Sequence, residues 1–285
     1  MWPSRMVFIS VIIPTYQRGH KLRESLDAVM AAMVQAVFAT QTSFELIVVD
    51  DCSADGTMDF LRSDIFDRQY CRYIRMPENS GPGLARNAGV SMSRGQWIWF
   101  LDDDDKLDAS QVIRMLAVLH DAPKSVEILS HSLKNAYPDS LTEARQDLMQ
   151  KVIYFQEHQE VFRHVVRRSL IVRHQIKFSR GFHEDIRYVF ELIFRSSGLK
   201  IFPFAVVYKQ NTEDSITAQM NDRRIDGYIK AYNEICAILQ GSYSAPKCDR
   251  KKMLIQTLGV LILLITRERD DLKALYLLRY LWDLT

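Results

Sequence analysis

The chain has 285 residues, of which 47% are hydrophobic and 25% are charged, a composition typical of a folded protein with a sizeable core. Its formal net charge of +2 is too small for wholesale nucleic-acid binding, which normally appears as a strongly basic domain, so no nucleic-acid partner is predicted. The four cysteines are widely scattered, so we expect reduced thiols in a cytoplasmic protein rather than a zinc site or a disulfide framework.

Predicted strands and helices alternate over the first hundred residues. The first strand is a continuous apolar run at 8–13 that stops at Pro14, and because no small-residue cleavage pattern follows it, we interpret it as a strand and not as a signal peptide. Further strands are predicted at 44–49, 71–75 and 96–101, and helices at 21–38, from 58 onward and at 84–92. This alternation predicts a mostly parallel, doubly wound α/β sheet, in which ligands bind at the carboxyl ends of the strands.

The pattern changes after residue 108. The sequence predicts helices at 112–119, 159–174 and 186–196, strands at 126–130 and 201–208, and only helices from 224 onward, including 253–265 and 272–284. The apolar stretch at 253–266 is about 14 residues long, short of the roughly 20 that a bilayer requires. We therefore predict no transmembrane helix.

Four adjacent aspartates, Asp102 to Asp105, directly follow the predicted strand at 96–101. Adjacent carboxylates repel one another and cost stability unless a cation neutralises them. Their hard oxygen atoms suit Mg²⁺ or Mn²⁺, which complete their shells with water and substrate phosphates. The alternative is a solvated acidic turn or helix cap. The position at a strand end favours a metal site with a diphosphate ligand.

Two weaker clusters follow neighbouring strands. Asp50 and Asp51 could accept hydrogen bonds from a ribose hydroxyl or a uracil N3–H, or could cap the next helix. In the loop from 79 to 87, Gly81 and Gly83 allow close backbone approach, and Arg86 could pair bidentately with phosphate. By itself this loop is also compatible with an ordinary turn that carries a surface arginine.

The strings SVIIPTY, ELIVVDDCSADGT, NSGPGLARNAG and GQWIWFLDDDD resemble, in order and spacing, the nucleotide-sugar domain of family 2 glycosyltransferases with the GT-A fold. A later string, FSRGFHEDIRYVFELIF, is similar to the acceptor-side half of bacterial polysaccharide and lipopolysaccharide transferases. The resemblance covers residues 8–217. It implies a GT-A catalytic domain at 1–218, with a nucleotide-sugar-binding half at 1–108 and an acceptor-side half at 109–218, followed by a helical C-terminal extension at 219–285.

This resemblance implies an inverting glycosyltransferase of bacterial cell-surface polysaccharide synthesis, such as capsule or lipopolysaccharide. The donor would be a UDP-sugar, the acceptor a saccharide or lipid-linked saccharide, and the metal Mn²⁺ or Mg²⁺. The expected location is the cytoplasm, with peripheral contact on the inner face of the cytoplasmic membrane as a further expectation. In many relatives a Tyr-Arg pair stands where this chain has Lys209 and Gln210, which leaves open which cation meets the diphosphate.

The resemblance also implies the site residues. Those predicted to bind the nucleotide-sugar are Pro14, Thr15, Tyr16, Arg18, Asp51, Gly81, Arg86, Asn87, Asp102 and Asp103. Asp104 is the predicted direct metal ligand, together with Asp102. In the predicted catalytic pair, Asp185 is the general base and Glu184 its neighbour, because an inverting transfer needs a carboxylate to deprotonate the acceptor hydroxyl. The alternative is an acidic first turn that caps the following helix.

Two further segments have open interpretations. The basic run from Arg163 to Arg180 either contacts an anionic acceptor or membrane face or is a solvated helix face. The apolar stripes at 254–265 and 272–282 predict helices that pack on the catalytic domain. Alternatively, these C-terminal helices form a homodimer interface or dock to a membrane or a partner enzyme.

Two other functions are weighed against the transferase. A sugar-phosphate nucleotidyltransferase would open with a glycine-rich, basic loop after its first strand, whereas this chain has Pro14 to Gly19. A noncatalytic nucleotide-sugar-binding subunit would not need the carboxylates Asp102 to Asp105 and Asp185. Both are therefore less favoured than the transferase.

Overall fold

A seven-stranded sheet forms the centre of the computed structural model, which describes residues 7–19, 21–62, 70–131, 160–209 and nine residues between 226 and 238. Its strands are β1 (Ile9–Thr15), β2 (Phe44–Asp50), β3 (Cys71–Arg75), β4 (Trp97–Phe100), β6 (Ile128–His131), β7 (His164–Arg167) and β8 (Leu199–Phe202), in the order β3-β2-β1-β4-β7-β6-β8. Only β7 runs antiparallel to its neighbours, β4 and β6. The mostly parallel α/β sheet predicted from the sequence is thus confirmed.

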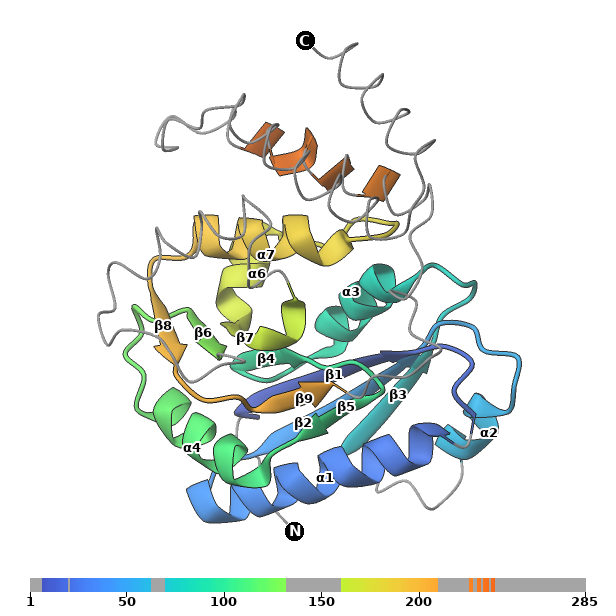
Figure 1. Cartoon of the computed structure of the whole chain (residues 1–285), viewed down its shortest axis with the longest axis horizontal. Helices are drawn as coiled ribbons and strands as arrows, with labels where there is room; N and C mark the ends of the chain where they lie inside the picture. Colours follow the sequence, from blue (N-terminus) through green and yellow to red (C-terminus); the bar gives the residue numbers. More distant parts are fainter. Residues whose placement is uncertain are drawn as a thin grey trace, which may run out of the picture.

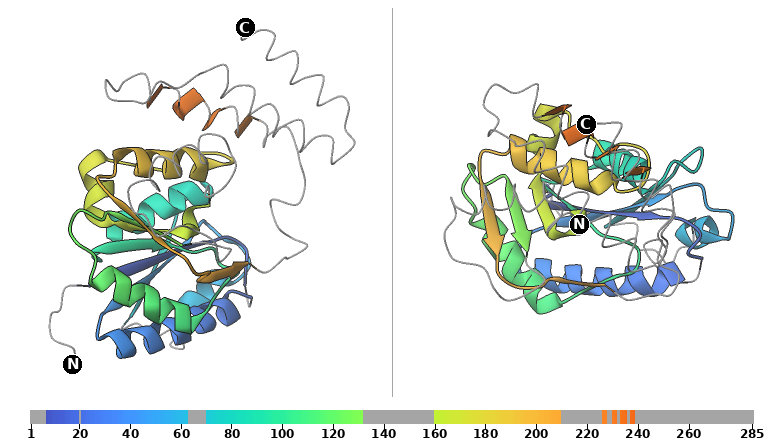
Figure 2. Two further views of the ribbon diagram at one scale, coloured as in Figure 1. Left: turned by 60° about the vertical axis from the view of Figure 1, so that its left-hand side comes forward. Right: turned by 45° about the horizontal axis from the view of Figure 1, so that its top comes forward.

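Helices cover both faces of this sheet (Figures 1 and 2). Helices α1 (Lys21–Thr40) and α4 (Ala109–His120) lie on one face, and α3 (Pro82–Met92), α6 (Arg168–His174) and α7 (Glu184–Arg195) lie on the other. Every residue of β1 and β2 is buried, as expected of strands covered on both sides. Two hydrophobic clusters fill the two interlayer spaces, and side chains such as Met33 and Phe190 are fully buried within them.

Shorter elements complete the fold. Helix α2 (Thr57–Arg62) follows β2, and a 3₁₀ turn, η1 (Val161–Arg163), precedes β7. A separate two-stranded sheet pairs β5 (Asp105–Leu107) with β9 (Val207–Lys209) in antiparallel register. The elements predicted before residue 108 match the observed ones to within two residues, except that β5 was not foreseen. Strand β5 is only three residues long, which is too short to give a pattern in the sequence. Its partner strand, β9, lies about a hundred residues away.

The predicted basic helix at 159–174 is wrong. Its described part divides into η1, strand β7 and the short helix α6. Val165 and Val166 are fully buried between β4 and β6, so sheet pairing overrides the helical spacing of the basic residues. The run also forms no single solvated face, because Arg163 is buried against Glu160 and Arg167 lies over the ring of Trp97. Contact with a membrane stays a prediction.

The predicted strand at 201–208 is also wrong, because it divides into β8 and β9 around Pro203. Pro203 directly follows β8, and proline has no backbone N–H to donate to a strand ladder. The helices predicted at 253–265 and 272–284 and the boundary at 218 lie outside the described residues. Within the described C-terminal part, Ala231 and Ile235 are buried in the cluster that contains α7. None of the helices described here is both long and apolar enough to cross a membrane.

Candidate active site

Three loops meet at the carboxyl ends of the central strands. Thr15, at the end of β1, is paired in register with Asp50 at the end of β2, and the backbone N–H of Asp51 donates to the carbonyl of Thr15 at 2.9 Å. On the other side of β1, β4 ends at Phe100 and leads into the aspartate loop. The structure thus brings the predicted residues of these three loops together, where a parallel sheet binds its ligands.

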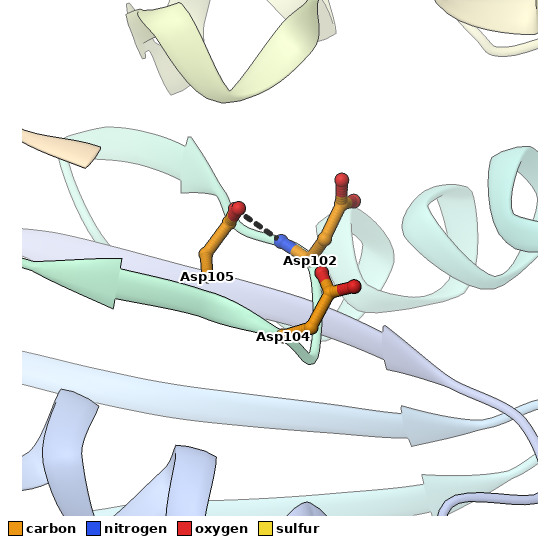
Figure 3. A group of neighbouring side chains, drawn as sticks. All are labelled: Asp102, Asp104 and Asp105. Atoms are coloured by element: carbon orange, nitrogen blue, oxygen red, sulfur yellow. Dashed lines mark hydrogen bonds between the residues drawn. The ribbon is translucent and has the colours of Figure 1, made fainter. Parts of the chain in front are cut away.

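The aspartate loop divides into two groups of side chains. One carboxylate oxygen from each of Asp102, Asp104 and Asp105 lies within 4.8 Å of the others, and Asp105 accepts the backbone N–H of Asp102 at 2.8 Å (Figure 3). Asp103 belongs to the other group, because it accepts hydrogen bonds from Thr15 Oγ1 at 2.7 Å and from Arg18 Nε at 2.9 Å. Three clustered carboxylates are a suitable oxygen donor set for Mg²⁺ or Mn²⁺.

Arg18 forms ion pairs with two carboxylates of this loop, Asp103 and Asp104. Its Nη2 lies 3.6 Å from Asp104 Oδ2, and a quarter of its side chain is exposed. Burial raises the pKa of Asp103 to about 6, and Arg18 and Thr15 oppose this shift. Arg18 therefore partly neutralises the carboxylates while part of its side chain stays exposed.

The loop that carries Arg18 is held by residues that sequence reasoning did not assign to the site. The backbone N–H of Gln17 donates to Ser53 Oγ at 2.8 Å, and that of Gly19 donates to Thr57 Oγ1 at 3.0 Å. Both Gln17 and Gly19 have positive φ angles, 51° and 43°. The DDCSADGT segment thus contributes hydroxyl groups that fix the loop after β1, a role typical of the serine and threonine of such turns.

Asp51 has a structural contact that the sequence did not reveal. Its two carboxylate oxygens accept the backbone N–H groups of Ser80 at 2.9 Å and Gly81 at 2.7 Å, and the residue is 3% exposed. Gly81 has a φ of 88°, a conformation that favours glycine, and it directly precedes α3. Asp51 therefore anchors the start of α3, and its contact with a nucleotide base stays a prediction. Of the residues predicted around the nucleoside, Pro14 is buried within β1, whereas 42% of Tyr16 is exposed.

Arg86 connects the aspartate loop to α7. It is 6% exposed, and its Nη2 donates to Asp102 Oδ1 at 2.7 Å while its Nη1 donates to Glu184 Oε1 at 2.8 Å. Burial acts to lower the pKa of Arg86, but Asp102, Glu184 and Asp185 outweigh it and raise the pKa. The sequence placed Arg86 beside the phosphates of a nucleotide, whereas in the structure both Nη groups donate to carboxylates of the protein.

Asp185 lies in the first turn of α7, next to Glu184, and is half-buried. Burial, with the adjacent charge of Glu184, raises the pKa of Asp185 to about 7, against the opposing effect of Arg86. Glu160, just before η1, adds to this upward shift. A carboxyl group with such a pKa can accept a proton near neutral pH, as a general base must. Sequence reasoning missed Glu160, because no motif connects it with α7.

Comparison with known proteins decides the family. The model of glycosyl transferase family 2 matches residues 10–187, which contain all of the site residues described above. The chain belongs to glycosyl transferase family 2. Among its curated relatives, this family 2 chain is 39% identical over 92 residues to the succinoglycan biosynthesis protein ExoO of Rhizobium meliloti (strain 1021). That match covers 32% of this chain and 26% of the length of ExoO.

Solved structures agree on the fold. The family 2 chain matches TarS 1-349 of S. aureus in complex with UDP-GlcNAc with a TM-score of 0.64 and 18% identity, over 89% of this chain and 71% of that one. It also matches the mannosyltransferase PcManGT of Pyrobaculum calidifontis, in complex with GDP-Man and Mn²⁺, with a TM-score of 0.56 and 16% identity, over 99% and 89% of the two chains. These similarities establish the GT-A fold expected from the sequence.

Proposed function

We propose that this chain is an inverting glycosyltransferase that transfers a sugar from a nucleotide-diphosphate sugar to a saccharide or lipid-linked saccharide acceptor in bacterial cell-surface polysaccharide synthesis. One observation carries the proposal. Arg86 joins the cluster of carboxylates after β4 to the first turn of α7, because it donates to Asp102 and to Glu184, the neighbour of Asp185, although about 80 residues separate the two segments in the sequence. A metal site for the donor diphosphate and a base for the acceptor hydroxyl are the two components that such a transfer requires.

On the donor side, Asp104 and Asp102 would hold Mn²⁺ or Mg²⁺. The metal, when bound, supplies positive charge for the departing diphosphate. Asp103 fixes the loop by accepting from Thr15 and Arg18, and Arg18 itself is partly exposed beside Asp104. Arg18 can therefore turn from Asp104 toward a phosphate oxygen without leaving the site.

On the acceptor side, Asp185 takes the proton of the attacking hydroxyl group. That oxygen forms a bond to the anomeric carbon while the bond from this carbon to the diphosphate oxygen breaks. No carboxylate of the protein needs to form a bond to the sugar, so the anomeric configuration inverts in a single displacement. Because burial favours the neutral acid, Asp185 accepts this proton more readily than an exposed aspartate would.

Two classes of nucleotide-sugar are candidates for the donor. UDP-sugars are the first candidates, because the family resemblance and the UDP-GlcNAc complex of TarS favour them. The complex of PcManGT with GDP-Man makes GDP-sugars the second candidates. A panel of both nucleotide classes therefore separates them.

The experiment measures nucleotide release from this panel with Mn²⁺, with Mg²⁺ and without metal, for wild type, Asp104→Ala and Asp185→Asn. Asp121→Asn is the matched control, because Asp121 lies at the exposed end of α4. We expect slow, metal-dependent hydrolysis of one donor class by wild type and by the control, and loss of hydrolysis in both site variants. Nucleotide binding with no release by wild type would instead indicate a noncatalytic binding subunit.

A further inference from the structure

One face of α3 holds the segment that leads into α7. Gly83, Arg86 and Asn87 are spaced at i, i+3 and i+4 and so share a face of the helix. Asn87 exchanges two hydrogen bonds of 2.9 Å with the backbone of Phe178, one from its Nδ2 to the carbonyl and one to its Oδ1 from the N–H. The segment that precedes α7 is therefore attached to α3 at Phe178.

Gly83 makes room for the stem of Glu184. A Cβ atom at Gly83 would lie 2.6 Å from Glu184 Cγ and 3.0 Å from Phe178 Cβ. Glu184 thus lies against the backbone of α3, and its carboxylate meets Arg86 one turn further along. Arg86 in turn lies over the ring of Phe178, 5.5 Å from its centroid. Contacts with the segment before α7 thus account for the glycine, the arginine and the asparagine of the NSGPGLARNAG motif without any contact with phosphate.

We propose that Arg86 is a positioning residue that fixes the metal-binding loop, through Asp102, and the base-bearing turn of α7, through Glu184, at a set separation. The proposal rests on the proposed glycosyl transfer. A rigid planar guanidinium can bridge two carboxylates that approach from different elements, whereas the single ammonium group of lysine is a compact point charge and cannot present the same fork. Glu184 is the partner through which Arg86 holds Asp185, so Glu184 also acts by positioning.

The test compares Arg86→Lys and Glu184→Gln with wild type, using kcat for release of the nucleotide from the preferred donor and the Kd for the free nucleotide with Mn²⁺, measured by calorimetry. Glu184→Gln keeps the size of the side chain but removes the negative charge that pairs with Arg86, so it weakens the link between Arg86 and α7 and remains informative where Arg86→Lys fails to fold. We expect kcat to fall at least tenfold in each variant. The Kd should change less than twofold in Glu184→Gln and rise at least threefold in Arg86→Lys, because only the latter variant loses the contact that orients Asp102.

Arg72→Lys is the matched control. Arg72 is another partly buried arginine of the sheet, and its Nη2 donates to Glu45 and to the carbonyl of Met92, away from the active site. A purely structural role for Arg86 predicts that Arg86→Lys and Glu184→Gln lower the melting temperature as Arg72→Lys does and leave kcat of the folded protein unchanged. A fall in kcat of less than threefold in either site variant overturns the positioning role. If wild type itself neither binds nor hydrolyses any nucleotide-sugar, the proposed function fails, which is a separate result.

Discussion

The two edges of the central sheet, where its parallel strands begin and where they end, differ in how their charged groups are balanced. At the amino-terminal edge, Glu45 of β2 accepts hydrogen bonds from Ser10 Oγ of β1, Arg72 of β3 and the backbone N–H of Arg94 before β4. One carboxylate thus meets one guanidinium and two further donors from the adjoining strands and connections. This balance of charge and hydrogen bonds ties the strand ends together.

At the carboxyl-terminal edge, carboxylates crowd together around the aspartate loop and the start of α7. These are Asp102, Asp103, Asp104, Asp105, Glu184 and Asp185, and among the described residues Arg18 and Arg86 form ion pairs with members of this group. Neighbouring carboxylates repel one another, so their concentration at one edge favours a ligand that carries positive charge. The comparison predicts that substitutions at one edge change turnover, whereas those at the other change stability.

The largest expected effect belongs to Asp185→Asn. Because the amide cannot accept the proton of the acceptor hydroxyl, kcat should fall on the order of 10³-fold, within the usual range for loss of a general base. Donor hydrolysis measures kcat, and calorimetry with the free nucleotide and Mn²⁺ should give an unchanged Kd. Retention of more than a tenth of wild-type kcat would assign the base to another group.

The next largest effect is expected for Asp104→Ala, which removes one oxygen donor of the clustered carboxylates. We expect kcat at fixed Mn²⁺ to fall by about 10²-fold, as when a main electrostatic contact to the leaving group is lost. The Mn²⁺ concentration for half-maximal activity should rise in the same variant. An unchanged Mn²⁺ titration would place the metal elsewhere.

At the opposite edge, Glu45→Ala should lower the free energy of unfolding by about 2 kcal/mol, because it removes the carboxylate partner of Arg72 and the acceptor of Ser10 Oγ and of the Arg94 N–H. Denaturant unfolding measures this loss. At a temperature where the variant is folded, its kcat should match that of wild type. A fall in kcat comparable to that of Asp104→Ala would mean that the amino-terminal edge also contributes to turnover.

The pH dependence tests the charge of the base. Burial and Glu184 favour the neutral acid and raise the pKa of Asp185 to about 7, so the ionised fraction of the base decreases about tenfold for each pH unit below that value. The kcat of wild type should therefore rise with pH between 5 and 7 and then level off. The residual activity of Asp185→Asn should lack this rise. A flat wild-type profile from pH 5 to 8 contradicts the assignment.

The smallest effect is expected for Arg180→Ala. Arg180 pairs with Glu78 at 3.5 Å, and more than 60% of each side chain is exposed. Exposed pairs of this kind contribute about 0–1 kcal/mol to stability. Thermal melting and donor hydrolysis should both match wild type. A clear loss of turnover would instead mean that Arg180 belongs to the active site.

Much of the fold could be predicted because its signals are local. The fully buried runs of β1 and β2 and the helical spacing of α1 and α4 are visible as patterns in the sequence. The exceptions share a cause. Strand β7 was predicted as helix because its two valines lie between regularly spaced basic residues, and only pairing with β4 and β6 shows that it is a strand. Likewise, the three-residue strand β5 forms only by pairing with β9, far away in the chain.

The sequence by itself determined which side chains gather at the carboxyl ends of the strands, because strand ends, turn residues and acidic runs are encoded in consecutive positions. Only the tertiary structure decided how those side chains divide their contacts. In the folded chain, Asp103 accepts a hydrogen bond from Arg18, and Asp51 accepts one from the backbone N–H of Gly81, just before α3. Arg86 donates to Glu184, which is 98 residues away in the sequence. The physical reason is that a hydrogen bond depends on distance and direction in space, and these are fixed only when the elements pack.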